Sequence, residues 1–137
     1  MNLSLNKRTS GIRYDGVALV DFEVRLLPLE DLYCPVPTVP AFVEELVSSI
    51  DRSGLLSPIV VVRGPREDIL RQIAVPKGFP SDPVVNVVCG GTNRIAAIRS
   101  LGYSHADCVL LPNFQLATNI QKRQHNDYIQ RKKNGTT

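Results

Sequence analysis

Two adjacent glycines stand between a short β-branched run and a segment with helical periodicity. Gly90 and Gly91 follow VVNVVC at residues 84–89, and Thr92 and Arg94 come directly after them in TNRIAAIRSLGY. A strand that delivers glycines to the start of a helix exposes backbone N–H groups without intrahelical partners, and their partial positive charge favours an anion. The Thr92 hydroxyl would donate a further hydrogen bond, and the Arg94 guanidinium would fork onto phosphate oxygens. The segment predicts a phosphate-binding turn; the alternative is a tight structural turn with a solvated arginine.

This turn is not one of the common nucleotide loops, because the lysine and spacing of the P-loop and the glycine spacing of GxGxxG are missing.

Elsewhere, Cys34, Cys89 and Cys108 are too widely spaced to indicate a disulfide framework or a zinc site. His105 and His125 have no partner at ligand spacing. Cys89 ends an apolar run, which is typical of a buried structural thiol. No catalytic residue and no metal ligand is assigned.

The net charge of +3 in 137 residues conceals an uneven distribution. Residues 1–13 contain three basic residues and no acid, residues 114–137 contain five basic residues and one acid, and the segment between them has a net charge of −4. Basic ends are either solvated or contact nucleic-acid phosphates without sequence specificity. The basic residues concerned are Lys7, Arg8, Arg13, Lys122, Arg123, Arg131, Lys132 and Lys133.

The sequence contains no segment that is long and apolar enough to cross a membrane, and its first residues lack the apolar core of a signal peptide. Unpatterned cysteines are typical of a reducing compartment. We therefore expect a soluble, cytoplasmic protein with no membrane partner.

Hydrophobic periodicity predicts two helices that flank the glycine turn. The first covers residues 40–53, with apolar residues on one face, Thr38 as its N-cap and Gly54 as its left-handed stop. The second covers residues 92–101 and takes Thr92 as its N-cap. We expect the start of this second helix to form the anion site.

Alternating or β-branched runs predict strands at residues 17–27, 59–63, 84–89 and 107–111. Residues 64–82 form a Pro- and charge-rich insertion that makes either a helical turn or a hairpin, and residues 113–133 form one or two exposed helices. The expected fold is α/β (α+β), with a small mixed sheet and flanking helices over residues 15–112. A flexible basic arm, residues 1–14, precedes this domain, and a basic, partly helical tail, residues 113–137, follows it.

Three separated segments resemble the N-terminal domain of the ParB family and its relatives in the ParB/sulfiredoxin fold. They are LVSSIDRSGLLSPIVVV, CGGTNRIAAIRSLGY and CVLLP, in the same order as the family's "SI…G…PI.V", "GERR.RAA…LG" and following strand, over roughly residues 20–125. The resemblance implies that the residues standing at the family's glycine-arginine motif bind nucleotide phosphates. These residues are Gly90, Gly91, Thr92, Asn93 and Arg94.

A further ParB motif, Glu-Asn-x-x-Arg, contributes to the handling of magnesium and CTP, and TNIQKR at residues 118–123 is its counterpart here. Asn119 is retained, whereas Thr118 replaces the carboxylate, so the resemblance implies CTP or ATP with magnesium as ligand but weak or no hydrolysis. In sulfiredoxins the loop reads Gly-Gly-Cys-His-Arg with a nucleophilic cysteine. Thr92 stands at that position, which disfavours sulfinic acid reductase activity.

The leading functional hypothesis is a ParB-like module that binds a nucleotide or another phosphate ligand. The alternative is a non-catalytic interaction protein, of phage or mobile-element type, that binds a protein or DNA through its basic ends; a second copy of the chain is also a candidate partner. The family's helix-turn-helix would follow residue 125, where about a dozen residues remain, so we expect no sequence-specific operator binding. A small nucleotide-dependent enzyme or nuclease of the same fold is the third hypothesis.

Overall fold

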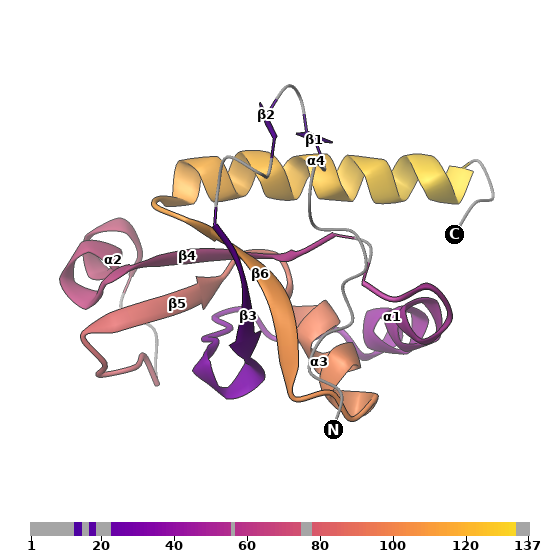
Figure 1. Cartoon of the computed structure of the whole chain (residues 1–137), viewed down its shortest axis with the longest axis horizontal. Coiled ribbons are helices and arrows are strands. Elements are labelled where there is room, and N and C mark those ends of the chain that lie inside the picture. Colours follow the sequence, from indigo (N-terminus) through magenta and orange to yellow (C-terminus); the bar gives the residue numbers. More distant parts are fainter. Residues whose placement is uncertain (1–12, 15–16, 19–22, 56, 75–77, 134–137) are drawn as a thin grey trace.

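A four-stranded mixed sheet forms the centre of the fold in the computed structural model, which describes residues 13–14, 17–18, 23–55, 57–74 and 78–133 (Figure 1). The strand order is β3 (Glu23–Pro28), β6 (His105–Leu111), β4 (Ile59–Pro65) and β5 (Val84–Val88). β4 is parallel to β6, and the other two pairings are antiparallel. The predicted α/β domain with a small mixed sheet is therefore confirmed.

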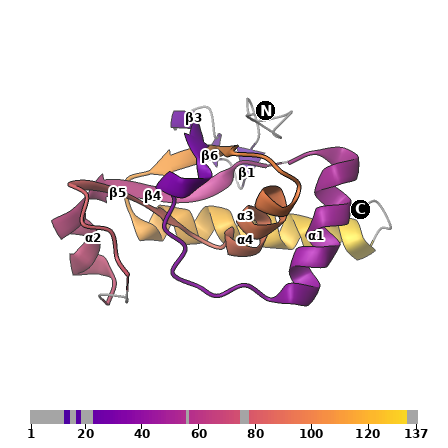
Figure 2. The same cartoon turned by 90° about the horizontal axis from the view of Figure 1, so that it is seen from below.

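Helices cover both faces of this sheet, and the first four residues of β4 are therefore buried on both sides. Successive side chains of a strand point to opposite faces. Ile59 and Val61 belong to the layer beneath α1 (Pro40–Ser53) and α3 (Thr92–Ser100), whereas Val60 and Val62 belong to the layer beneath α2 (Arg66–Gln72) and α4 (Phe114–Lys133). In Figures 1 and 2, α1 and α3 lie together on one side, away from α2.

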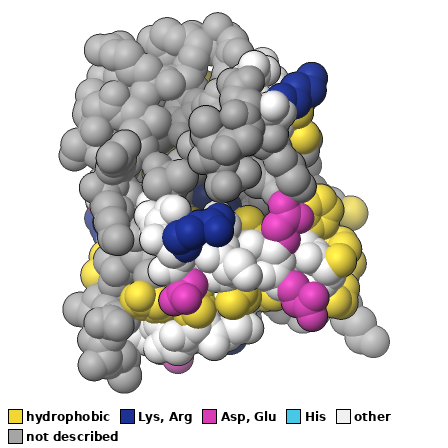
Figure 3. Space-filling view, turned by 90° about the vertical axis from the view of Figure 1, so that its right-hand side faces the viewer, with side chains coloured by type: hydrophobic (Ala, Val, Ile, Leu, Met, Phe, Trp, Pro, Cys, Tyr) yellow, Lys and Arg dark blue, Asp and Glu magenta, His cyan; other side chains and the backbone are white. Residues whose placement is uncertain are grey.

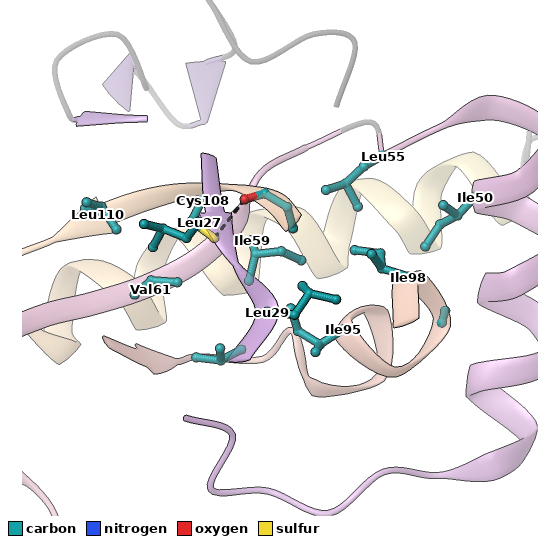
Figure 4. Packing of buried hydrophobic residues seen from close by; sticks show 13 residues of the cluster. Leu27, Leu29, Ile50, Leu55, Ile59, Val61, Ile95, Ile98, Cys108 and Leu110 are labelled. Carbon is teal, nitrogen blue, oxygen red and sulfur yellow. Dashed lines mark hydrogen bonds between the residues drawn. The ribbon is translucent and has the colours of Figure 1, made fainter. Parts of the chain in front are cut away.

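The layer that holds α1 and α3 fixes the position of the glycine turn. Ile50 of α1 and Ile95 and Ile98 of α3 point toward Ile59 and Leu29 (Figure 4). All five side chains are buried, and burying an aliphatic side chain of this size contributes roughly 1.5–3 kcal/mol to stability. The two helices are thereby held against each other and against the sheet.

The predicted helix over residues 40–53 is confirmed at both ends, and Gly54 follows it with a φ of +75°. The N-cap assignment is wrong: Val39, not Thr38, occupies the N-cap position. The second predicted helix is also present, from residue 92 to residue 100, but its N-cap is Gly91 and not Thr92. Neither N-cap residue, Val39 or Gly91, therefore has a side chain that can accept a hydrogen bond.

The predicted strand over residues 17–27 is only partly confirmed, since β2 (Val17–Ala18) and β3 are separate strands. β2 pairs with β1 (Arg13–Tyr14) in a small second sheet that lies beside α4 (Figure 1). The predicted arm, with Lys7 and Arg8, otherwise falls at residues 1–12, outside the described residues.

The predicted insertion at residues 64–82 contains α2, whose Ile69 is buried against the sheet. Arg66 connects this helix to the chain that returns to β5: its N–H donates to the Pro83 carbonyl at 2.9 Å, and its Nε donates to the Pro80 carbonyl at 2.8 Å. Residues 114–133 form the single helix α4. Among the helices of the described residues, none combines the length and the apolar character needed to span a membrane.

Candidate functional site

The glycine turn links the end of β5 to the start of α3. The Cys89 N–H still donates to the Val60 carbonyl at 2.9 Å, so the sheet pairing continues for one residue beyond β5. Gly90 then adopts a φ of +74°, and Gly91 adopts φ −106° and ψ 10° as the N-cap of α3. Only Gly90 therefore needs glycine for its backbone conformation.

Packing around the turn constrains Gly91 more than Gly90, because the atoms close to Gly90 belong to the exposed side chain of Gln121. A Cβ at Gly90 would lie 2.5 Å from the Gln121 Cδ atom of α4. A Cβ at Gly91 would lie 3.0 Å from Ile59 Cγ2 and 3.2 Å from Val88 Cγ1. The close approaches at both glycines are made by the protein itself, so the glycine pair has a structural role whether or not a ligand binds.

The first turn of α3 has no side-chain cap. Gly91 has no capping side chain, the first turn contains no acidic residue, and the first intrahelical bond runs from the Ile95 N–H to the Gly91 carbonyl at 2.9 Å. The N–H groups of Thr92, Asn93 and Arg94 precede that bond and have no acceptor within the helix. Together with the helix dipole they form a region of positive potential.

Asn93 joins this helix start to the start of α1. Its Oδ1 accepts a hydrogen bond of 2.8 Å from the backbone N–H of Val39, 54 residues earlier in the chain. Val39 is the N-cap of α1, Pro40 follows it, and the first turn of α1 also lacks an acidic residue. The amino-terminal ends of two helices therefore lie next to each other, and their dipoles act on the same region.

Arg94 is held against the connection between α1 and β4. Its Nη1 donates to the Ser57 carbonyl at 3.0 Å and lies 3.3 Å from the Ser57 Oγ. The positive charge also acts on the buried Cys108 thiol, where it opposes the rise of the pKa. The guanidinium is thus a fixed positive charge near the start of α3, with part of its hydrogen-bonding capacity directed to Ser57.

Thr92 faces a cysteine that sequence spacing did not associate with the turn. The Thr92 side chain makes a hydrogen bond with the thiol of Cys34, which lies in the connection between β3 and α1. Burial raises the pKa of Cys34, and this hydrogen bond and the charge of Arg99 oppose the rise. The thiol is therefore protonated at neutral pH, and thiolate chemistry is not favoured at this position.

The other two cysteines are still weaker nucleophiles. Burial raises the pKa of Cys89 to about 11. Burial and the neighbouring Asp107 charge raise the pKa of Cys108 to about 12. The structure describes no group of three or more His, Cys, Asp and Glu side chains that could hold a metal ion within residues 13–14, 17–18, 23–55, 57–74 and 78–133.

Asn119 lies on α4 and not at the start of α3. Gln121 is the α4 residue that contacts Gly90, and residues two positions apart face different sides of a helix. Asn119 is exposed, between the buried Ala117 and Ile120. The structure thus brings Gly90 to Arg94 together, places Gln121 over them, and leaves Asn119 on another side of α4.

The basic residues of the carboxyl-terminal segment all lie on α4, since Lys122, Arg123, Arg131, Lys132 and Lys133 fall within its 20 residues. Lys122 and Lys133 are exposed and, being eleven residues apart, lie on the same side of the helix. Arg13 lies in β1, which contacts α4. The two basic ends of the sequence are thus neighbours at Arg13 and α4.

No protein-family model matches the chain, and no curated protein sequence matches it. Solved structures similar to it include sulfiredoxin from Arabidopsis thaliana, with 22% identity and a TM-score of 0.47 over 72% of this chain and 97% of that one. They also include SbnI with a C-terminal truncation from Staphylococcus aureus, with 18% identity and a TM-score of 0.48. This second match covers 66% of the chain, which spans 31% of that SbnI structure. The structural similarity to sulfiredoxin and SbnI extends over most of the chain.

Proposed function

We propose that this domain binds the phosphate group of a small ligand at the adjacent amino-terminal ends of α1 and α3. The observation that supports the proposal most directly is the hydrogen bond from the Val39 N–H to Asn93 Oδ1, because it sets two uncapped helix starts side by side. A nucleotide such as CTP or ATP is the class of ligand that the sequence resemblance implies.

The ligand's phosphate oxygens would accept hydrogen bonds from the first amides of α3, with the Thr92 hydroxyl as a further donor. The amides of Ala41 and Phe42 lie in the corresponding first turn of α1. Arg94, anchored on Ser57, adds a fixed positive charge nearby. The proposal is limited to binding, because Thr118 stands where the resembling motif has a carboxylate and no hydrolytic group is identified.

Nuclear magnetic resonance titration with CTP, ATP and inorganic phosphate, each with and without magnesium, tests this site. We expect the largest amide shifts at Thr92, Asn93, Arg94, Ala41 and Phe42. Shifts confined to other elements, or no saturable shift with any of the ligands, would refute the proposal.

The Asn93→Asp variant separates charge from structure. Aspartate keeps an oxygen acceptor for the Val39 N–H, and a negative charge at a helix amino terminus is itself favourable. Stability should therefore be retained while affinity for phosphate falls by about tenfold, the equivalent of about 1.4 kcal/mol of electrostatic repulsion. Asn126→Asp, the same substitution at an exposed position of α4, is the matched control and should leave phosphate affinity unchanged.

We also propose that α4 binds nucleic acid without sequence specificity. This helix contains five basic residues and only one acidic residue, and β1, which carries Arg13, lies beside it. We expect weak binding of random duplex DNA that falls steeply with salt. Lys122→Ala with Lys133→Ala should reduce retardation of DNA in gels at low salt. Retardation that is independent of salt, or unaffected by this pair of substitutions, would contradict the proposal.

A further inference from the structure

The connection between β3 and α1 is hydrogen-bonded to the outer edge of β5. Tyr33 pairs with Val87 in the parallel sense. The Tyr33 N–H donates to the Asn86 carbonyl at 2.8 Å, and the Val88 N–H donates to the Tyr33 carbonyl at 2.8 Å. The Asn86 side chain also donates to the Asp31 carbonyl at 3.4 Å. The connection is therefore fixed to the sheet at Tyr33.

The insertion at residues 64–82 contacts this connection through a pair of aromatic rings. The rings of Tyr33 and Phe79 meet edge to face, with their centroids 5.3 Å apart and an interplanar angle of 81°. Both side chains are half-buried against the layer beneath α2 and α4. Arg66 holds Phe79 in turn, since its guanidinium carbon lies 5.5 Å from the ring centroid and its Nε is bonded to the next residue, Pro80. Edge-to-face ring pairs and cations over ring faces are both favourable contacts.

The chain from Tyr33 to the start of α1 is stiffened by proline. We call residues 33–39 the proline connection; Figure 2 shows this part of the chain running from the sheet to α1. The prolines are Pro35, Pro37 and, directly after the connection, Pro40. Each proline fixes its own φ and keeps the preceding residue out of the helical region, so the connection is a semi-rigid spacer. Holding one end at Tyr33 therefore restricts the position of the other end, Val39.

The far end of the proline connection meets the start of α3. Here Asn93 accepts the hydrogen bond of Val39 at 2.8 Å, and Thr92 is hydrogen-bonded to the Cys34 thiol. Figure 3 shows acidic, basic and hydrophobic side chains interspersed at the end of the molecule that carries α1. A surface of mixed charge gives an anion little attraction at long range. Affinity for phosphate at the two helix starts therefore depends on how closely their amides are placed.

We propose that Phe79 and Tyr33 are positioning residues for the phosphate site. They hold the proline connection on the edge of β5 and thereby hold the start of α1 against the start of α3. This inference rests on the proposed function, and it gives the insertion a role in that site although no residue of the insertion lies at either helix start. The coupling is reciprocal, so phosphate bound at the helix starts also stabilises the connection at Tyr33.

Hydrogen exchange measured by nuclear magnetic resonance without ligand tests the first step. Phe79→Ala removes the ring, and the stabilisation typical of an edge-to-face pair corresponds to about three- to tenfold faster exchange of the Val39 and Val88 amides. The neighbouring Cys89 amide is the internal control, because it donates to Val60 on the other side of the same strand. Rates expressed relative to Cys89 are corrected for any change in overall stability.

Phe114→Ala is the matched control variant. Phe114, at the start of α4, is half-buried and packs against the same layer as Phe79, but it lies outside the insertion. Its replacement should leave the relative exchange of Val39 and Val88 unchanged. Phe79→Leu keeps most of the apolar volume without the ring, and it should accelerate the same two amides even if Phe79→Ala does not fold.

Titration with inorganic phosphate tests the second step. The dissociation constant should rise about three- to tenfold in Phe79→Ala and stay unchanged in Phe114→Ala, and phosphate should slow exchange of Val88 in the wild-type chain. Unchanged relative exchange in the Phe79 variants, an equal acceleration in Phe114→Ala, or wild-type phosphate affinity in the Phe79 variants would overturn the proposal. If the wild-type chain binds no phosphate, the proposed function fails, and exchange at Val39 alone decides whether Phe79 positions the start of α1.

Discussion

Removing the side-chain oxygen that joins α3 to α1 is predicted to cost about 1 kcal/mol of stability. Asn93 Oδ1 accepts the 2.8 Å bond from the Val39 N–H, and both groups are exposed, so water can partly replace the bond in the variant. A hydrogen bond of this kind contributes about 0.5–1.5 kcal/mol, and loss of an acceptor at a helix start costs about 1 kcal/mol. Alanine is the better helix former by up to about 0.7 kcal/mol, which offsets part of the loss in Asn93→Ala.

The Asn126→Ala variant isolates the bond, because it gains the same helix propensity at an exposed position of α4. In urea unfolding followed by circular dichroism, Asn93→Ala should be about 1 kcal/mol less stable than Asn126→Ala, equivalent to a difference in Tm of roughly 3–5 °C at this chain length. Hydrogen exchange of the Val39 amide should accelerate only in Asn93→Ala. Equal stability of the two variants, with unchanged exchange at Val39, would refute this role of Asn93.

Three further predictions concern the turn, a buried thiol and the insertion. Gly90→Ala and Gly102→Ala both place alanine at a φ above +70°, and each should lower the free energy of unfolding in urea by about 1–2 kcal/mol. Gly90→Ala should be the costlier of the two, because its Cβ would meet a side chain of α4, whereas a Cβ at Gly102 would meet nothing within 4 Å. Burial raises the pKa of Cys108 to about 12 in the folded chain, so the unfolded chain loses the thiol proton at a lower pH than the folded chain does. The free energy of unfolding should therefore fall above pH 9 by up to about 1.4 kcal/mol per pH unit, and Cys108→Ala should make this fall less steep. Ile69→Ala should cost about 2–5 kcal/mol by removing the buried anchor of α2, whereas Ile129→Ala should change stability by less than about 0.5 kcal/mol.

The sequence predicted the elements whose signals are local. The helix over residues 40–53 has a continuous apolar face, a proline in its first turn and a glycine stop, and the structure reproduces both of its ends. The strand over residues 17–27 was predicted less well, because alternation alone does not show where a strand leaves one sheet. In the structure, pairing with β6 begins only at Glu23.

The contacts at the two helix starts could not be predicted from sequence because they join distant segments of the chain. Thr38 is a suitable N-cap by type, yet the acceptor near the start of α1 is Asn93, which only the tertiary fold brings to Val39. Thr92 was likewise assigned as a cap, and its hydroxyl instead meets Cys34. In both cases a contact between segments more than 50 residues apart determines the structure at the helix start, and the preference of threonine for the N-cap position does not.

The residues that first suggested an anion site are not the ones on which that site can be tested. Gly90 is required by its backbone conformation, and Gly91 is required by the close packing of Ile59 and Val88. Replacing either glycine would perturb the fold, so a loss of binding would not distinguish a ligand contact from a packing defect. A charge placed on Asn93 leaves that packing intact and changes only the electrostatic potential at the two helix starts. Phosphate affinity in Asn93→Asp, measured alongside Asn126→Asp, therefore separates the two interpretations of the turn.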